Sequence, residues 1–404
     1  MSGVLPYGRQ SVSEDDIAAV VRVLRSDWLT QGPLVEDFEA GIRNATGAAH
    51  AVACNSGTAA LHLATMAAGL REGHAAIVPA ITFVATANAV RMTGAEVVFA
   101  DVDPQTGRMD ASTLEAAFAR AGAGSQKIHA VLPVHLGGAA SSVAEIAAVS
   151  GRRNAMVIED ACHALGGSHP DSRGRTVPAG SCSDSAMACF SFHPVKPVTT
   201  AEGGAVTTND AVLAAHMQRL RSHGLNRQPD LLENRAEGFA ASGEVNPWYY
   251  EMPEIGWNYR ISDIQCALGV SQLEQLVAFR SHRDALARQY RRLLAPLVPS
   301  IVPAPEAEGV QSGHHLFVVL IDFDALGLTR AHVMKELRQQ GVGTQVHYIP
   351  VPWQPYYASR YGKGDYPGAA RYYRRCLSLP LFATMGEADV PRVVETLAKV
   401  LKLQ

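Results

Sequence analysis

Short runs of consecutive apolar residues recur through the first half of the chain, and stretches with a helical pattern separate several of them. Most of these runs are continuously apolar rather than alternating, which is typical of strands covered on both faces. Helical stretches at 59–68 and 143–149 lie between them. The pattern predicts a large α/β domain whose seven-stranded, mainly parallel sheet carries helices on both sides. The predicted strands are residues 51–54, 77–80, 97–100, 130–134, 156–159, 186–191 and 205–208.

The second half of the chain has a different pattern. Residues 229–253 are mostly polar, with three prolines and a Trp-Tyr-Tyr cluster, and they predict a long loop. Residues 261–294 predict a helix in two pieces. A smaller C-terminal α/β domain follows, so we expect the domains to be 1–274, with an N-terminal arm, and 275–404. The expected elements of the smaller domain are a strand at 315–321, a helix at 329–340, a strand at 343–348 and a closing helix at 387–403.

The amino-acid composition of the chain argues against several classes of function. Hydrophobic residues make up 47% of the chain, which is enough for a substantial core. The net charge of −3 provides no basic surface for nucleic acid. The apolar runs are only of strand length, and the start MSGVLP lacks a basic segment followed by an apolar one, so we expect neither a membrane span nor a signal peptide. The six cysteines show no metal-type spacing, which favours reduced thiols, no bound metal and a cytoplasmic location.

Lys196 is the first candidate for chemistry. The chain has six lysines against 29 arginines, and no other lysine lies between Lys127 and Lys335. Lys196 follows the apolar run 186–190, which places it at the end of a buried strand. An amine in a partly desolvated site loses its proton more easily, and the neutral amine is the nucleophile that forms a Schiff base with an aldehyde. The alternative is a lysine on an ordinary exposed loop.

Further candidates lie at the same predicted edge of the sheet. Residues 55–61 (NSGTAAL) follow a strand and open a helix, a pattern that suits either a phosphate cradle or a plain helix cap. Asp160 ends a buried strand, where it can face a ligand cation or simply solvate the strand end. Phe83 follows another strand and can cover a flat ring or fill the core. His163 and His193 flank the edge at a spacing that matches no metal motif.

Together these residues supply an amine for an aldehyde, an acid for a ring cation, a cradle for an anion and an aromatic face. Pyridoxal phosphate needs this set of groups, because a carboxylate keeps its pyridine nitrogen protonated and lets the ring act as an electron sink. The sequence therefore predicts an enzyme that uses pyridoxal 5'-phosphate as its cofactor.

Six blocks, in order along most of the chain, resemble the DegT/StrS family of sugar-nucleotide aminotransferases, which have the aspartate-aminotransferase-like fold (PLP fold type I). The resemblance implies that Lys196 carries the cofactor covalently, that Asp160 pairs with its pyridine nitrogen and that Phe83 stacks on its ring. It also implies that Asn258 reaches the cofactor phosphate of the neighbouring subunit, which makes the protein a homodimer with shared active sites. The blocks are 29–33 (LTQGP), 55–61 (NSGTAAL), 82–88 (TFVATAN), 159–164 (EDACHA), 191–196 (SFHPVK) and 256–260 (GWNYR).

The same resemblance implies one set of cofactor contacts and one set of substrate contacts. Lys196 and Asp160 are the catalytic residues, and both belong to the cofactor set. The cofactor contacts are Gly57, Thr58, Ala59, Phe83, Asp160, His163, Ser191, Lys196 and Asn258. The substrate contacts are Tyr7, Asp27, Trp28, Leu29, Thr30, Ser56, His193, Asn258, His347, Tyr348, Ile349 and Pro350.

The family also holds dehydratases in which a histidine replaces the lysine, so Lys196 favours an aminotransferase. Pro197 and Ala201 depart from the common family form, in which Asn and Gly occupy these positions. The segment around Pro197 and Ala201 resembles the corresponding segment in the branch that makes pseudaminic acid. Residues 221–224, 248–251 and 345–350 resemble the same branch. That branch moves an amino group from L-glutamate to C4 of a UDP-linked 4-keto-6-deoxy-N-acetyl hexosamine. The alternatives are another nucleotide ketosugar (C3 or C4, dTDP or GDP) and a non-catalytic regulator with this fold.

Overall fold

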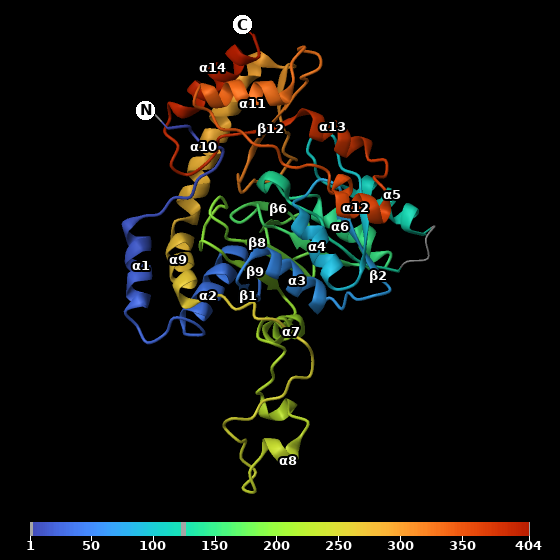
Figure 1. The fold of residues 1–404 in the computed structure, drawn as a ribbon, viewed down its shortest axis with the longest axis vertical. Helices are drawn as coiled ribbons and strands as arrows, with labels where there is room; N and C mark the ends of the chain where they lie inside the picture. The colour runs from blue at the N-terminus through green and yellow to red at the C-terminus, as the bar shows by residue number, and fades with distance from the viewer. Residues whose placement is uncertain (1–2, 123–126, 404) are drawn as a thin grey trace.

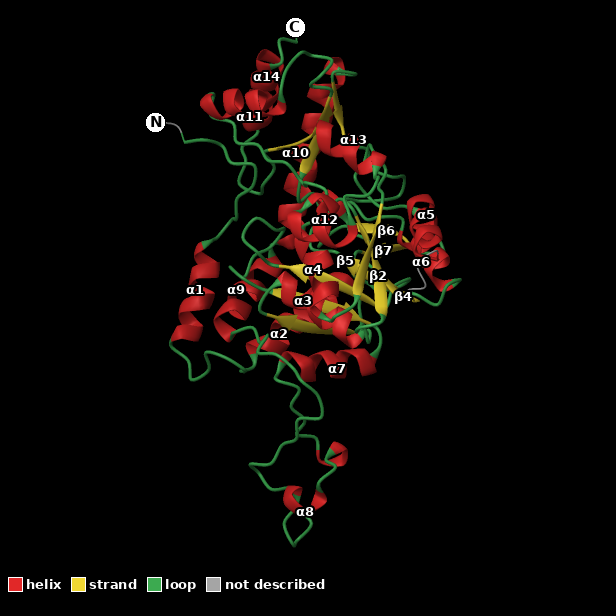
Figure 2. Ribbon diagram, turned by 45° about the vertical axis from the view of Figure 1, so that its right-hand side comes forward, coloured by secondary structure: helices red, strands yellow, loops and turns green. Residues whose placement is uncertain are grey.

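The centre of the computed structural model, which describes residues 3–122 and 127–403, is a seven-stranded sheet (Figures 1 and 2). In spatial order its strands are β1 (His50–Cys54), β9 (Gly204–Thr208), β8 (Met187–Ser191), β5 (Met156–Asp160), β4 (Lys127–Val131), β2 (His74–Pro79) and β3 (Glu96–Ala100). β9 runs antiparallel to β1 and β8, whereas the other neighbouring pairs are parallel. The predicted seven-stranded, mainly parallel sheet is therefore confirmed.

Helices cover both faces of this sheet. Consecutive residues of a strand point to opposite faces, and on β1 Val52 and Cys54 join one apolar cluster while Ala51 and Ala53 join another. The strands are continuously apolar because both of their faces are buried. The helices of the first face are α3 (Gly57–Ala67), α4 (Val84–Met92) and α7 (Ala211–Arg221), and those of the second are α2 (Leu34–Thr46), α5 (Ala111–Gly122), α6 (Val143–Gly151) and α9 (Asp263–Glu274).

A second apolar core holds the C-terminal part of the chain together. The N-terminal segment joins this core, since Leu5 pairs with Val342 and packs against the cluster. We propose Gln275, which lies between two long helices, as the boundary between the larger and the smaller domain. The core is formed by β10 (Ile301–Pro303), β11 (Phe317–Ile321) and β12 (Cys376–Leu379), in one antiparallel sheet, and by α10 (Leu276–Leu294), α11 (Arg330–Gln339) and α14 (Asp389–Val400).

The strand predicted at 343–348 is wrong. Of these residues, Gln345 forms a single bridge with Ser378, and the N–H of Gly343 bonds to the carbonyl of Leu5 (2.8 Å). The segment divides its backbone hydrogen bonds between two neighbours, so no continuous ladder forms. The third strand of the small sheet is β12, whose four residues are too few for the apolar pattern to distinguish.

The remaining described elements surround these two cores. They are α1 (Glu14–Leu24), the hairpin β6 (Ser168–Pro170) and β7 (Thr176–Pro178), the short helices α8 (Arg235–Gly238), α12 (Pro355–Tyr361) and α13 (Pro367–Arg375), and the 3₁₀ turns Leu136–Gly138, Pro229–Leu231, Ala295–Leu297 and Val351–Trp353. Within residues 3–122 and 127–403, no helix combines the length and apolarity that a membrane crossing requires.

An arm projects from the body between α7 and α9 and includes the predicted long loop (Figure 1). At its neck Asn226 and Glu251 exchange backbone hydrogen bonds of 2.8 and 3.0 Å. The Glu251 carboxylate also accepts the N–H groups of Glu233 and Asn234, each at 2.8 Å. These bonds organise the arm internally, yet its tip leaves Trp248 74% exposed.

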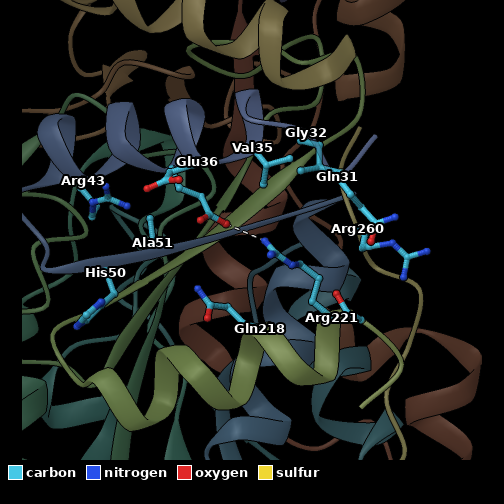
Figure 3. A pocket seen from close by; sticks show the side chains of 13 residues that line it. Gln31, Gly32, Val35, Glu36, Arg43, His50, Ala51, Gln218, Arg221 and Arg260 are labelled. Carbon is cyan, nitrogen blue, oxygen red and sulfur yellow. Dashed lines mark hydrogen bonds and ion pairs between the residues drawn. The ribbon is translucent and has the colours of Figure 1, made fainter. Parts of the chain in front are cut away.

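β1 is an edge strand, and two charged side chains bind its free backbone groups beside a cavity (Figure 3). The Glu39 carboxylate accepts the Ala53 N–H (2.9 Å), and the Arg221 guanidinium donates both to the Ala53 carbonyl (2.7 Å) and to Glu39 (2.7 Å). Both side chains are largely buried, so each ion compensates the charge of the other. The pair occupies backbone groups that would otherwise be free to bind a further strand.

Replacing Glu39 by Ala should destabilise the fold, because it leaves the Arg221 charge and the Ala53 N–H without their partner. We expect the free energy of unfolding to fall by about 3 kcal/mol, measured by denaturant unfolding. Glu36→Ala, at an exposed position of the same helix, is the matched control and should change it by less than about 0.5 kcal/mol. Equal stabilities of the two variants would contradict the role of the ion pair.

Candidate functional site

A cavity of about 440 Å³ opens at the carboxyl ends of the sheet strands and is closed on its other side by residues 345–348. It brings together residues that lie more than 300 positions apart in the sequence. Of the predicted site residues, those that line it are Tyr7, Ser56, Gly57, Thr58, Phe83, Asp160, His163, Ser191, His193, Lys196, His347 and Tyr348.

The N-terminus of α3 forms one wall of the cavity. Ser56 caps the helix, and its hydroxyl accepts the N–H of Ala59 (3.1 Å). A Cβ on Gly57 would lie 2.7 Å from the Cβ of Ser191, so only glycine allows the helix start to approach β8 this closely. The result is a concave surface at the positive end of a helix, which suits a phosphate group.

Asp160 lies at the end of β5, where its carboxyl group accepts two hydrogen bonds. Its side chain is almost fully buried, Oδ2 accepts the Thr86 hydroxyl (2.7 Å) and Oδ1 accepts the N–H of Cys162 (3.2 Å). Thr82 in turn bonds to the Thr86 hydroxyl (2.7 Å). Both donors fix the orientation of the Asp160 side chain, which lines the cavity. Sequence reasoning missed Thr86, although its i, i+4 spacing from Thr82 places both on one face of the segment.

Lys196 lies in the turn that follows β8, where its N–H bonds to the carbonyl of His193 (2.8 Å). Burial lowers the pKa of its amine, and the Cys162 thiol and the Asp160 carboxylate offset part of this effect. The Lys196 amine therefore loses its proton more easily than the amine of an exposed lysine, and the neutral amine is the nucleophile. Phe83 faces the same cavity with 54% of its surface exposed, so it is not a core residue.

The hydrogen bonds of His163 define its tautomer. The N–H of Gly137 donates to Nδ1 (3.2 Å), so Nε2 carries the proton and lies 3.3 Å from the Tyr348 hydroxyl. Burial and the nearby Lys196 charge lower the pKa of His163 well below its usual value. Burial also lowers the pKa of His347 to about 3. His163 and His347 are therefore neutral near pH 7 and act as hydrogen-bonding groups rather than as cations.

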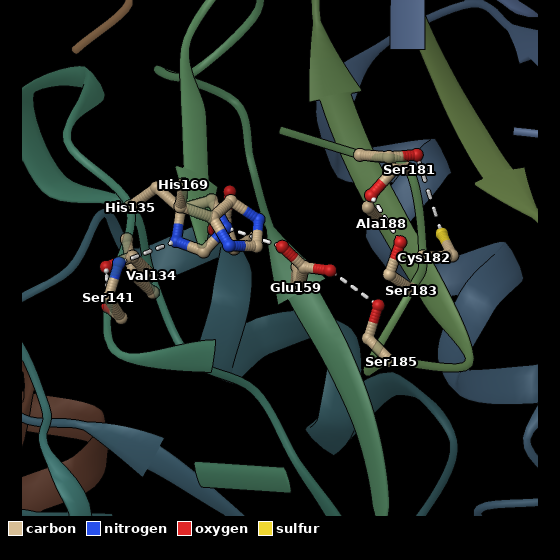
Figure 4. A network of polar contacts seen from close by, with 12 residues as sticks. Val134, His135, Ser141, Glu159, His169, Ser181, Cys182, Ser183, Ser185 and Ala188 are labelled. Atoms are coloured by element: carbon tan, nitrogen blue, oxygen red, sulfur yellow. Dashed lines mark hydrogen bonds and ion pairs between the residues drawn. The ribbon is translucent and has the colours of Figure 1, made fainter. Parts of the chain in front are cut away.

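A buried polar network supports this arrangement from behind the sheet (Figure 4). The N–H of Ser141 donates to Nδ1 of His135 (3.1 Å), so Nε2 carries the proton that His135 donates to Glu159 (2.6 Å). The Ser185 hydroxyl also donates to Glu159. The N–H of His135 bonds to the carbonyl of Asp160 (3.1 Å). The network thus anchors the turn whose Gly137 orients His163, and no pattern in the sequence had indicated it.

Several predicted residues do not reach the cavity of their own chain. Asn258 lies at the base of the arm, where its carbonyl accepts the side-chain N–H of Asn55 (3.3 Å). Trp28 and Leu29 are exposed. The predicted residues that do not line the cavity are Asp27, Trp28, Leu29, Thr30, Ala59, Asn258, Ile349 and Pro350. Those that line it without having been predicted include Thr82, Cys162, Glu202, His315 and Gln345.

Two further observations bear on the chemistry. Among the described residues no group of three or more His, Cys, Asp and Glu side chains is arranged to hold a metal ion. All six cysteines are free, and burial beside Asp160 raises the pKa of the Cys162 thiol well above its usual value. The groups of the cavity that remain for chemistry are the Lys196 amine and the carboxylates of Asp160 and Glu202.

Comparison with known proteins gives a consistent result over nearly the whole chain. Residues 10–398 match the model of the DegT/DnrJ/EryC1/StrS aminotransferase family. The spore coat polysaccharide biosynthesis protein SpsC of Bacillus subtilis is 36% identical over 401 residues, which cover 98% of this chain and 97% of that protein.

Solved structures agree with this result. Helicobacter pylori PseC, an aminotransferase involved in the biosynthesis of pseudoaminic acid, has a TM-score of 0.86 at 28% identity and covers 99% of both chains. The PLP form of the putative sugar aminotransferase Spr1654 from Streptococcus pneumoniae has a TM-score of 0.84 at 26% identity, again over 99% of both chains. The chain belongs to the DegT/DnrJ/EryC1/StrS aminotransferase family and is a PLP-dependent sugar aminotransferase.

Proposed function

We propose that this aminotransferase moves an amino group from L-glutamate to C4 of a UDP-linked 4-keto-6-deoxy-N-acetyl hexosamine, a step of pseudaminic acid biosynthesis. The observation that carries the proposal is the likeness to the H. pylori enzyme over the full length of both chains. Residues 196–204 and 345–350, in which the sequence resembles that branch, border or line the cavity.

The residues of the cavity fit pyridoxal phosphate. The start of α3, where a Cβ on Gly57 would collide with Ser191, would hold the phosphate together with Thr58 and Ser191. Asp160 would pair with the ring nitrogen, and Phe83 would cover the ring. When bound, the cofactor supplies an aldehyde that takes up the amino group and a ring that withdraws electrons from the reacting carbon.

The protein groups have separate tasks in the proposed reaction. The lowered pKa of Lys196 makes its Nζ a base, which accepts the proton from the α-carbon of the amino donor and later delivers a proton to C4 of the sugar. Thr86 and the N–H of Cys162 hold the Asp160 carboxyl group in place, where it would pair with the ring nitrogen of the cofactor. His163 directs its Nε2 proton to the Tyr348 hydroxyl at the wall of the cavity.

We further propose a homodimer with shared active sites. Asn258 does not line the cavity of its own chain, and it lies at the base of the projecting arm. On the arm, Trp248 is 74% and Ile255 75% exposed, an amount of apolar surface that a second copy would bury. In this arrangement the Asn258 side chain of one copy binds the cofactor phosphate of the other.

The substrate assignment is tested with a panel of nucleotide ketosugars that carry UDP, dTDP or GDP and a ketone at C3 or C4. With L-glutamate as donor, the UDP-linked 4-keto-6-deoxy-N-acetyl hexosamine should give the highest kcat/KM, with the product identified by mass and NMR. Lys196→Ala is the control and should give no product with any sugar. A higher kcat/KM for a dTDP or GDP sugar would assign the enzyme to another branch of the family.

Two substitutions distinguish the role of the Asp160 charge from that of the Thr86 hydroxyl that binds it. Asp160→Asn should lower kcat/KM by roughly several orders of magnitude, because it removes the charge that keeps the ring nitrogen protonated. Thr86→Val should lower it only about 10- to 100-fold, because the carboxylate remains but loses one donor. Thermal unfolding checks that both variants are folded. Near-normal turnover of Asp160→Asn would mean that Asp160 only terminates its strand.

The shared site is tested by mixing two inactive variants. Lys196→Ala and Asn258→Ala should each be inactive alone, and a mixture allowed to exchange subunits should recover up to about one quarter of the wild-type activity, since random exchange makes half of the dimers mixed and each mixed dimer has one intact site. A mixture that stays inactive after exchange has been verified by mass spectrometry would contradict the model.

A further inference from the structure

The cavity contains little that can bind the carboxylate of an amino donor. Among the described residues that line it, Lys196 is the one lysine or arginine, and its amine is needed for the reaction. Every α-amino acid carries a carboxylate on the carbon that also carries its amino group. That carboxylate must therefore lie close to Lys196, deep in the cavity, whereas the diphosphate of a nucleotide sugar, attached across the ring from C4, lies towards the opening.

His315 stands at this deep position. Its side chain lines the cavity, is only 5% exposed, and its ring lies 4.3 Å from that of His163, centroid to centroid. The ring forms no hydrogen bond with the described residues, and its Nδ1 is buried without a partner. His163 differs, since both of its ring nitrogens have partners. Burial and the Lys196 charge lower the pKa of His315 well below its usual value, so the ring is neutral and has one N–H to donate.

The adjacent His314 has different surroundings from those of His315. His314 faces away from the cavity, and its Nε2 bonds to Asp284 (3.1 Å) near Glu306. Its hydrogen-bonding capacity is used within the fold. Two neighbouring histidines of similar burial thus have different surroundings. Of the two, only His315 lines the cavity and has a ring without a hydrogen-bond partner among the described residues.

Arg283 supplies a positive charge behind His315. Its side chain is 4% exposed, its Nη1 makes one long bond to the carbonyl of Pro197 (3.4 Å), and its Nε and Nη2 have no partner. No carboxylate among the described residues lies within 4.0 Å of it. The bond to Pro197, next to Lys196, and that of Asp284 to His314 place Arg283 between the lysine segment and the histidine pair.

A buried guanidinium without a counter-ion is energetically costly, and an anion that binds nearby recovers part of this cost. From this geometry we propose that His315 binds the α-carboxylate of the amino donor through a ring N–H, and that the Arg283 charge supports this binding without contacting the donor. The inference rests on the proposed function only in that the donor is an α-amino acid.

The test uses the holoenzyme and L-glutamate alone, so it gives a result whichever sugar is the acceptor. Loss of the absorbance band of the bound cofactor reports the donor half-reaction, and its dependence on glutamate gives a half-saturating concentration and a limiting rate. His315→Phe keeps the aromatic contact with His163 but has no N–H. We expect its half-saturating glutamate concentration to rise roughly 10- to 100-fold, the loss typical of a hydrogen bond to a charged group, with the limiting rate within about threefold.

Three matched variants complete the experiment. His315→Gln restores an N–H and should recover most of the affinity for glutamate, whereas His314→Phe should leave that affinity unchanged. Arg283→Met should weaken glutamate binding without loss of bound cofactor or of thermal stability. His315→Leu replaces His315→Phe if the latter does not retain cofactor. An unchanged half-saturating concentration in the His315 variant would overturn the proposal.

Discussion

The close approach of three backbone segments is the constraint on which the site depends. The start of α3, the end of β8 and the start of β9 meet without intervening side chains, since a Cβ on Gly57 would collide with Ser191 and one on Gly204 would lie 2.3 Å from the carbonyl of Ser56. This contact brings the positive end of a helix beside the turn that carries Lys196. The anion cradle and the amine are therefore adjacent because of backbone packing.

Burial then determines the charge of three histidines at the cavity. Charged imidazoles beside a lysine would be costly to desolvate. Burial lowers the pKa values of His163, His315 and His347, so these rings are neutral near pH 7. Asp160 accepts two hydrogen bonds. The cavity therefore combines the Lys196 amine and the carboxylates of Asp160 and Glu202 with neutral histidine rings.

Two buried arginines differ in whether a carboxylate compensates their charge. Arg221 is paired with Glu39 and protects the edge of the sheet. Arg283 has no carboxylate within reach among residues 3–122 and 127–403, although burial lowers its pKa to about 10. An ion pair that is complete within the chain contributes to the fold, whereas an uncompensated charge beside the cavity is available to an anionic ligand. The proposed donor site rests on the unpaired arginine, and the proposed dimer rests on the exposed apolar arm.

The sequence by itself determined the sheet, the positions of Lys196 and Asp160 at strand ends, and the family. Continuous apolar runs indicate strands because burial of both faces is a local requirement, and the motifs at Lys196 and Asp160 are contiguous in sequence. Only the tertiary structure decided that Thr86 supports Asp160, that Phe83 faces the cavity, and that residues 343–348 do not form a strand. It likewise separated His315 from His314. Such contacts join segments far apart in the chain, and local patterns encode how buried a residue is but not which distant side chain it meets.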